Sequence, residues 1–218
     1  MTQSRRTLTT LATLAGLLLA GCHVTESDRD GSKNVSIGTP FGSMKVATGK
    51  TVDAASVGIS PYPGATPVQD QGDDGNNANV QMSFGGFHLG VRAADFQTAD
   101  SPQKVLAFYR QDLSSRYGAP IECRDQHPIG SPDRTAQGLT CKNDEGSRVA
   151  GSKVQISGVH PKGVVILSND SPSETEIELR AGSPKRMHVV GVEPHNGGTQ
   201  ISLVSIDLPT GHDSSDSE

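Results

Sequence analysis

The chain has 218 residues, a length that leaves room for one domain of common size beside short terminal segments. Its formal net charge of −5 at pH 7 and its lack of long Lys/Arg runs exclude a protein held on nucleic acid through phosphate contacts. Only 33% of residues are hydrophobic and 4% aromatic, whereas the chain contains 25 Gly and 13 Pro. This composition predicts a modest core built from short strands and many turns.

The first residues have the pattern of an export signal. Arg5 and Arg6 precede an apolar stretch over residues 8–20, which is too short to span a bilayer. Small residues then lead to Cys22 in the sequence Leu19-Ala20-Gly21-Cys22. The segment around Arg5 and Arg6 also partly resembles a twin-arginine signal, so the export route stays open.

This segment resembles the lipobox of bacterial lipoproteins, and the resemblance covers residues 1–22. It implies that residues 1–21 are removed and that Cys22 becomes the first residue of the mature chain, acylated with fatty acids such as palmitate. A thiolate is the nucleophile that can take the lipid. Each buried methylene contributes about 0.8 kcal/mol, so two or three acyl chains hold far more firmly than one. The alternative is an ordinary secretory signal with a chance cysteine.

The resemblance also implies a location and a partner. The mature chain is expected to be anchored to bacterial membrane lipid through Cys22, with its domain in the periplasm or at the cell surface. His23 rather than Asp follows the cysteine, which by resemblance to lipoprotein sorting rules favours the outer membrane over the inner one.

The rest of the chain divides by composition into three parts. Residues 22–34 have almost nothing apolar to bury and are expected to be a solvated linker. Residues 35–208 are expected to form a single α+β domain, mostly of antiparallel strands. Residues 209–218 are acidic and rich in Ser, which predicts a disordered tail.

Short segments of alternating polarity, separated by turn residues, predict the strands. A turn at 39–42 divides the segment 35–48 into two strands, Gly85-Gly86 marks a bulge or tight bend, 69–79 is expected to be a flexible loop, and 195–198 is a hairpin signal. The other strand candidates are 80–84, 87–91, 121–123, 138–141, 154–157, 164–168, 174–180, 187–193 and 199–208.

One amphipathic helix is predicted over about 102–117. Its apolar residues recur every fourth position, at Val105, Tyr109, Leu113 and Tyr117. Ser101 or Asp100 is expected to cap its start, and Gly118 to end it. The segment 98–113, together with the turn at 62–65, is similar to one in uncharacterised bacterial envelope proteins. That similarity implies a shared α+β module and no catalytic residues.

Cys123 and Cys141 are the remaining cysteines of the expected mature domain. In an oxidising compartment such a pair usually bridges, so we predict a disulfide. A metal site or a redox-active pair is the alternative, but redox pairs are typically two residues apart and zinc needs about four ligands.

A search for known chemical motifs assigns no catalytic, cofactor-binding or metal-binding residue. The seven His residues are scattered, without a paired spacing that suits a metal. Neither a Gly-x-Ser-x-Gly elbow nor a phosphate loop is present. The leading hypothesis is therefore a non-enzymatic lipoprotein that binds an envelope partner or small ligand, or has a structural role. The alternative is an envelope hydrolase whose site is assembled from residues distant in the sequence.

Overall fold

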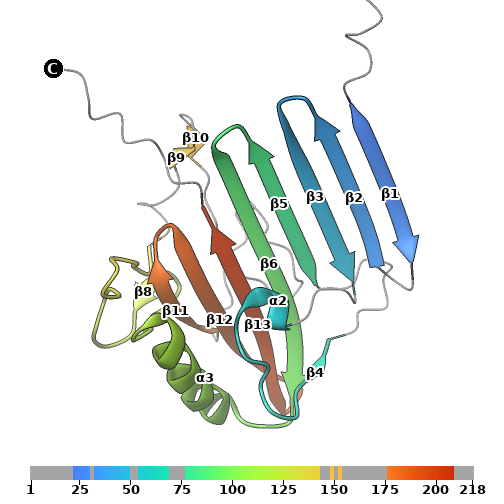
Figure 1. The fold of residues 1–218 in the computed structure, drawn as a ribbon. Coiled ribbons are helices and arrows are strands. Elements are labelled where there is room, and N and C mark those ends of the chain that lie inside the picture. The colour runs from blue at the N-terminus through green and yellow to red at the C-terminus, as the bar shows by residue number, and fades with distance from the viewer. Residues whose placement is uncertain are drawn as a thin grey trace, which may run out of the picture.

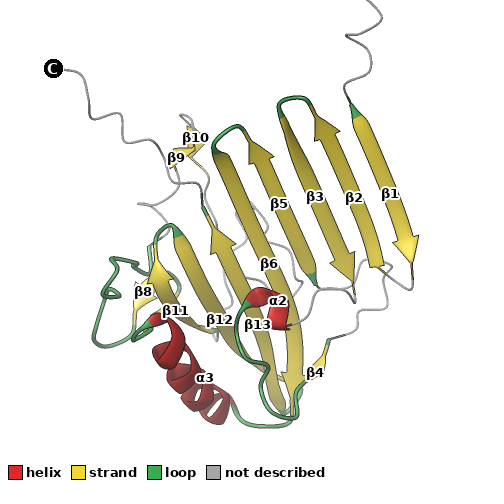
Figure 2. Ribbon diagram, viewed as in Figure 1, coloured by secondary structure: helices red, strands yellow, loops and turns green. Residues whose placement is uncertain are grey.

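The computed structural model describes residues 22–29, 32–49, 54–68, 77–142, 148–149, 152–153 and 176–208. Over these residues the chain forms a large antiparallel sheet with two helices on it (Figure 1). The expectation of mostly antiparallel strands with one long helix is confirmed, although strands dominate more than the α+β label suggests (Figure 2).

The elements of the large sheet and its helices are β1 (His23–Arg29), β2 (Ser32–Thr39), β3 (Gly42–Gly49), α2 (Ala54–Val57), β4 (Thr66–Pro67), β5 (Ala78–Phe84), β6 (Phe87–Thr98), α3 (Pro102–Tyr117), β7 (Ile121–Arg124), β8 (His127–Pro128), β11 (Ile177–Ser183), β12 (Arg186–His195) and β13 (Gly198–Asp207). Two short strands, β9 (Arg148–Val149) and β10 (Ser152–Lys153), pair with each other.

The strand order is β1-β2-β3-β5-β6-β13-β12-β11-β7-β8, and β4 pairs with β6 beside this path. Most neighbours are joined by hairpins, as at the predicted turns 39–42, 85–86 and 195–198. Asn196 and Gly197 both have positive φ, which suits the tight turn between β12 and β13. The pairing of β6 with β13 joins residues about a hundred positions apart and unites the two halves of the sheet.

Helix α3 has the predicted bounds, and its apolar stripe forms the main core. Val105, Leu106, Tyr109 and Leu113 are buried against strands β11, β12 and β13. Ser101 occupies the N-cap position, yet its side chain makes no capping hydrogen bond. We call the side of the sheet under α3 the α3 face and the opposite side the back face.

The turn at 62–65 is fixed to α3 by aromatic and polar contacts. The ring of Tyr62 lies 5.2 Å from that of Phe108 in an edge-to-face arrangement, and its hydroxyl donates to Asp100 at 2.7 Å. Ser60 Oγ donates to Asp112 at 2.7 Å, and Arg116 binds the same carboxylate at 3.1 Å. The turn at 62–65 and helix α3 therefore pack together.

The predicted disulfide agrees with the structure. The sulfur atoms of Cys123 and Cys141 are 1.99 Å apart, and both residues are buried with Ile121 in a small cluster under β7. The bridge closes a loop of 18 residues. A loop of that size is expected to stabilise the fold by roughly 3 kcal/mol, mainly by restricting the unfolded chain.

Three predictions differ from the structure. In place of the linker over 22–34, β1 begins at His23 and β2 at Ser32. β1 buries almost nothing and is held by its main-chain pairing with β2. Residues 138–141 form only an isolated bridge between Arg134 and Thr140, and residues 78–79 of the predicted loop begin β5. The strand candidates 154–157 and 164–168 and the tail 209–218 lie outside the described residues.

Candidate functional site

Neither of the helices that the structure describes lies over the β1–β5 half of the sheet. Helix α3 contacts β11, β12 and β13, and the short helix α2 contacts β6 and β13 (Figure 2). Within the described part of the chain, neither helix contacts β1, β2, β3 or β5. Most side chains of β2, β3 and β5 are half-buried, and those described on β1 are exposed. These strands therefore present side chains for contact on both faces.

The two faces of this half differ in polarity because side chains alternate along each strand. On the back face, apolar residues align across the strands in two rows. The register gives Val35, Val46, Val80 and Val91 as one row and Ile37, Met44, Met82 and Leu89 as the other. The α3 face of the same strands carries mainly polar and basic residues.

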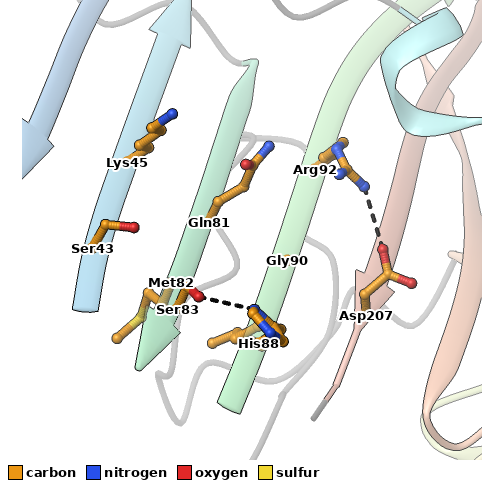
Figure 3. Close-up of a pocket in the computed structure, with 10 residues that line it drawn as sticks. Ser43, Lys45, Gln81, Met82, Ser83, His88, Gly90, Arg92 and Asp207 are labelled. Carbon is orange, nitrogen blue, oxygen red and sulfur yellow. Dashed lines mark hydrogen bonds and ion pairs between the residues drawn. The ribbon is translucent and has the colours of Figure 1, made fainter. Parts of the chain in front are cut away.

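A shallow hollow of about 280 Å³ opens on this polar face, over β3, β5 and β6 (Figure 3). Lys45, Gln81, Gly90 and Asp207 form one cross-strand row through it. Gly90 contributes no side chain to the middle of that row, so the floor of the hollow is backbone. A Cβ placed on Gly90 would lie 3.6 Å from Cβ of Asp207, which is ordinary contact. The fold therefore has room for a side chain there.

Two cations and one carboxylate line the hollow. Arg92 Nη1 lies 3.4 Å from Asp207 Oδ2, and Arg186 binds the other oxygen of Asp207 at 3.0 Å. Lys45 has no carboxylate partner among the residues that the structure describes. Polar hydrogen-bonding groups surround these charges. An anionic or hydroxyl-bearing group would find complementary donors here.

Ser83 and His88, which both line the hollow, form a contact of the kind found in nucleophilic sites. Ser83 Oγ lies 2.9 Å from His88 Nδ1, and both side chains are accessible (Figure 3). A serine beside a histidine is one part of a nucleophilic site, which also needs a group that orients the base. Of the described carboxylates, none is hydrogen-bonded to His88.

A second group of charges is buried on the back face, away from the hollow. Glu176, Glu178 and Arg180 are each less than one-tenth exposed. Arg180 Nε donates to Glu178 Oε2 at 2.8 Å, and Arg180 Nη1 donates to the carbonyl oxygen of Cys141 at 2.9 Å. Arg180 thus connects β11 to the disulfide loop.

Glu176 differs from the other two members of this group in its hydrogen bonding. Its Oε2 atom is buried and has no hydrogen-bond partner among the residues that the structure describes. Burial, together with the nearby carboxylates of Glu178, Glu193 and Asp95, raises the pKa of Glu176 from 4.5 to about 8. Glu176 is therefore mostly protonated at neutral pH.

The residues singled out from the sequence lie far apart in the sheet. Cys22 is exposed and directly precedes β1 at one edge, whereas Cys123 and Cys141 lie near β7 at the other. Of the His residues, His88 lines the hollow. His188 is buried under the ring of Tyr117 at 3.6 Å, and this burial lowers the pKa of His188.

Sequence reasoning missed the hollow itself. The available signal was the alternation of polar residues in the strand segments 80–84 and 87–91, together with Gly90. This signal was incomplete, because Asp207, which also lines the hollow, comes from the far end of the chain. Within the described ranges, no group of three His, Cys, Asp or Glu residues is arranged to hold a metal ion. Nor does that part of the chain contain a helix long and apolar enough to cross a membrane.

Comparison of the chain with protein-family models, curated proteins and solved structures gives no match.

Proposed function

We propose that this chain is a lipoprotein of a bacterial envelope, tethered through acylated Cys22, whose sheet is a non-enzymatic binding module. The hollow at Gly90 carries the second half of the proposal, because it offers Lys45 and Arg92 to a partner on a face that no described helix covers. The partner is expected to present carboxylate, phosphate or hydroxyl groups.

Three observations support the tether. The sequence Leu19-Ala20-Gly21-Cys22 resembles a lipobox, and Cys22 is exposed one residue before the first strand. The disulfide-bonded pair of Cys123 and Cys141 fits an oxidising compartment outside the cytoplasm.

The tether predicts which cysteine carries lipid. In cells grown with radioactive palmitate, the wild-type chain is expected to take up label and to have Cys22 as its first residue. Cys22→Ala is expected to lose the label and to keep residues 1–21, because the acyl acceptor is gone. The double variant Cys123→Ala/Cys141→Ala is the matched control and should keep the label. Label that persists in Cys22→Ala, or an unlabelled wild-type chain, contradicts the tether.

The binding module predicts a partner that depends on the hollow. Wild-type protein captured from detergent-solubilised membranes is expected to retain a stoichiometric partner, and Gly90→Leu is expected to lose most of it. The added side chain can occupy the hollow without a clash in the sheet, since a Cβ on Gly90 would be in ordinary van der Waals contact with Asp207. Ala107→Leu adds similar bulk at an exposed position of α3 and should leave capture unchanged.

Two results would count against this module. Capture that is equal for Gly90→Leu and the wild type would remove the hollow from the binding surface. Turnover of ester or amide substrates by the purified protein, lost in Ser83→Ala, would favour the envelope hydrolase instead, because Ser83 and His88 are in contact.

A further inference from the structure

Two hairpin turns lie at the same end of the sheet as the start of β1 (Figure 1). The register shows this directly, since His23 pairs with Gly38 just before the turn from β2 to β3. Gly42, just after that turn, pairs with Phe84, which precedes the turn from β5 to β6. Cys22 and both turns therefore share one end of the sheet.

Each of these turns carries an exposed aromatic ring. Phe41 is 84% exposed and Phe84 is 41% exposed, which makes them two of the few large apolar residues that the described chain leaves open to solvent. The ring of Phe84 lies against Gly42, where any side chain would collide with it. We call Phe41 and Phe84 the aromatic tips. Burying a Phe side chain is favourable because it removes apolar area from water, so these tips have apolar area to offer a partner.

The turns around the aromatic tips contain no charge. Residues 39–42 read Thr-Pro-Phe-Gly and residues 84–87 read Phe-Gly-Gly-Phe. Contact with an apolar phase would therefore strip water from no ionised side chain, which would otherwise be the main cost. Phe is among the side chains that membrane-surface segments bury at the boundary between lipid headgroups and acyl chains.

Spacing brings the tips near the expected lipid. Only one peptide unit separates Cys22 from His23, so acyl chains on Cys22 would begin at the end of the sheet. Neighbouring strands are about 4.8 Å apart, which places β3 roughly 10 Å and β5 roughly 15 Å from β1 along the sheet. Acyl chains that enter a bilayer at Cys22 would hold this end of the sheet at the bilayer surface.

We propose that the aromatic tips insert into the interfacial region of the same bilayer that holds acylated Cys22. They would form a second anchor, with the ends of the strands that carry the tips facing the membrane. This inference rests on the tether proposed above. It adds an orientation, in which Phe41 and Phe84 touch lipid while β7 and β8 at the other edge of the sheet do not.

The absence of Trp from the chain makes a direct test possible. Phe41→Trp and Phe84→Trp each introduce a single fluorophore at a tip. Ile129→Trp is the matched control, because Ile129 is 38% exposed and follows β8 at the far edge. Each full chain is expressed with its signal, purified from membranes, and reconstituted into vesicles of equal parts phosphatidylethanolamine and phosphatidylglycerol, with or without brominated acyl chains.

In the same vesicles, the tip variants are expected to emit at shorter wavelength than Ile129→Trp. They are also expected to be quenched several-fold more strongly than Ile129→Trp by brominated lipid. Equal quenching in the tip and control variants, with acylated Cys22 found by mass spectrometry of the same preparation, overturns this inference and leaves the tether intact. A preparation whose Cys22 carries no acyl chain instead refutes the tether, and with it the anchor described here.

Discussion

Arg180→Met is expected to lower the free energy of unfolding by roughly 3–5 kcal/mol. The substitution removes the guanidinium that binds Glu178 and the carbonyl oxygen of Cys141. Glu178 would then be a buried carboxylate beside Glu176 without its cation, and such an uncompensated charge is far more costly than an exposed one. Urea unfolding of the purified variant and wild type, followed by circular dichroism, measures the difference.

Two further variants make this prediction specific. Arg186→Met removes an arginine whose side chain is 76% exposed and is expected to change stability by at most about 1 kcal/mol. The double variant Glu178→Met/Arg180→Met removes both buried charges and should recover much of the loss, because apolar replacement of a whole ion pair is often tolerated. A double variant as unstable as Arg180→Met alone would show that the ion pair is not the cause.

The stability of the wild-type protein is expected to fall as pH rises toward 8, chiefly because of Glu176. The pKa of this carboxyl is raised from 4.5 to about 8 in the folded chain, so the folded state holds the proton more tightly than the unfolded state. The resulting stabilisation is complete below pH 4.5 and is lost as pH rises through about 8. At roughly 1.4 kcal/mol per pKa unit, the total effect is several kcal/mol.

Glu176→Gln is expected to flatten this dependence, since an amide keeps the shape of the protonated acid and never ionises. His188 has the opposite slope, because its lowered pKa disfavours the folded state as pH falls below 6.5. Measurements of unfolding between pH 6.5 and about 8 therefore report mainly on Glu176. Glu26→Gln, on exposed β1, is the control. A wild-type curve as flat as that of Glu176→Gln would contradict the assignment.

Local signals in the sequence were enough to predict helix α3 and the hairpins. Val105, Tyr109 and Leu113 are four residues apart and therefore lie on one face of a helix. Pro102 and Gly118 mark the ends of that helix. The hairpins follow from turn residues between alternating segments, as at Asn196 and Gly197. In each case the residues that decide the structure are neighbours in the chain.

β1 was predicted as a linker for a physical reason. Its sequence offers almost no apolar side chain to bury. A polarity pattern reveals a strand only when one face of that strand is buried. The strand instead exists through main-chain hydrogen bonds along its whole length to β2, and main-chain pairing leaves little trace in side-chain polarity. Nothing in residues 23–29 alone could have distinguished a paired edge strand from solvated chain.

The hollow and the buried charges depend on contacts between distant segments. Asp207 reaches Arg92 only because β13 pairs with β6, more than a hundred residues earlier. Likewise, the alternation of Glu178 and Arg180 with Leu179 in the sequence is typical of a strand whose charged face is exposed. Only the folded sheet shows that both charged residues are buried. A sequence pattern can place such residues on a face but cannot tell which face becomes covered.

The pairing of β6 with β13 also has a consequence for the order in which the protein assembles. If the chain folds from its N-terminus, the strands β1, β2, β3, β5 and β6 can pair early, because each pairs with a strand that is near it in the sequence. The outer backbone of β6 then stays open until Gly198–Asp207 is available to pair with it. During that interval the β1–β6 meander presents an open strand edge to other extended chains. The time at which the last strand pairs is therefore expected to affect the risk of aggregation.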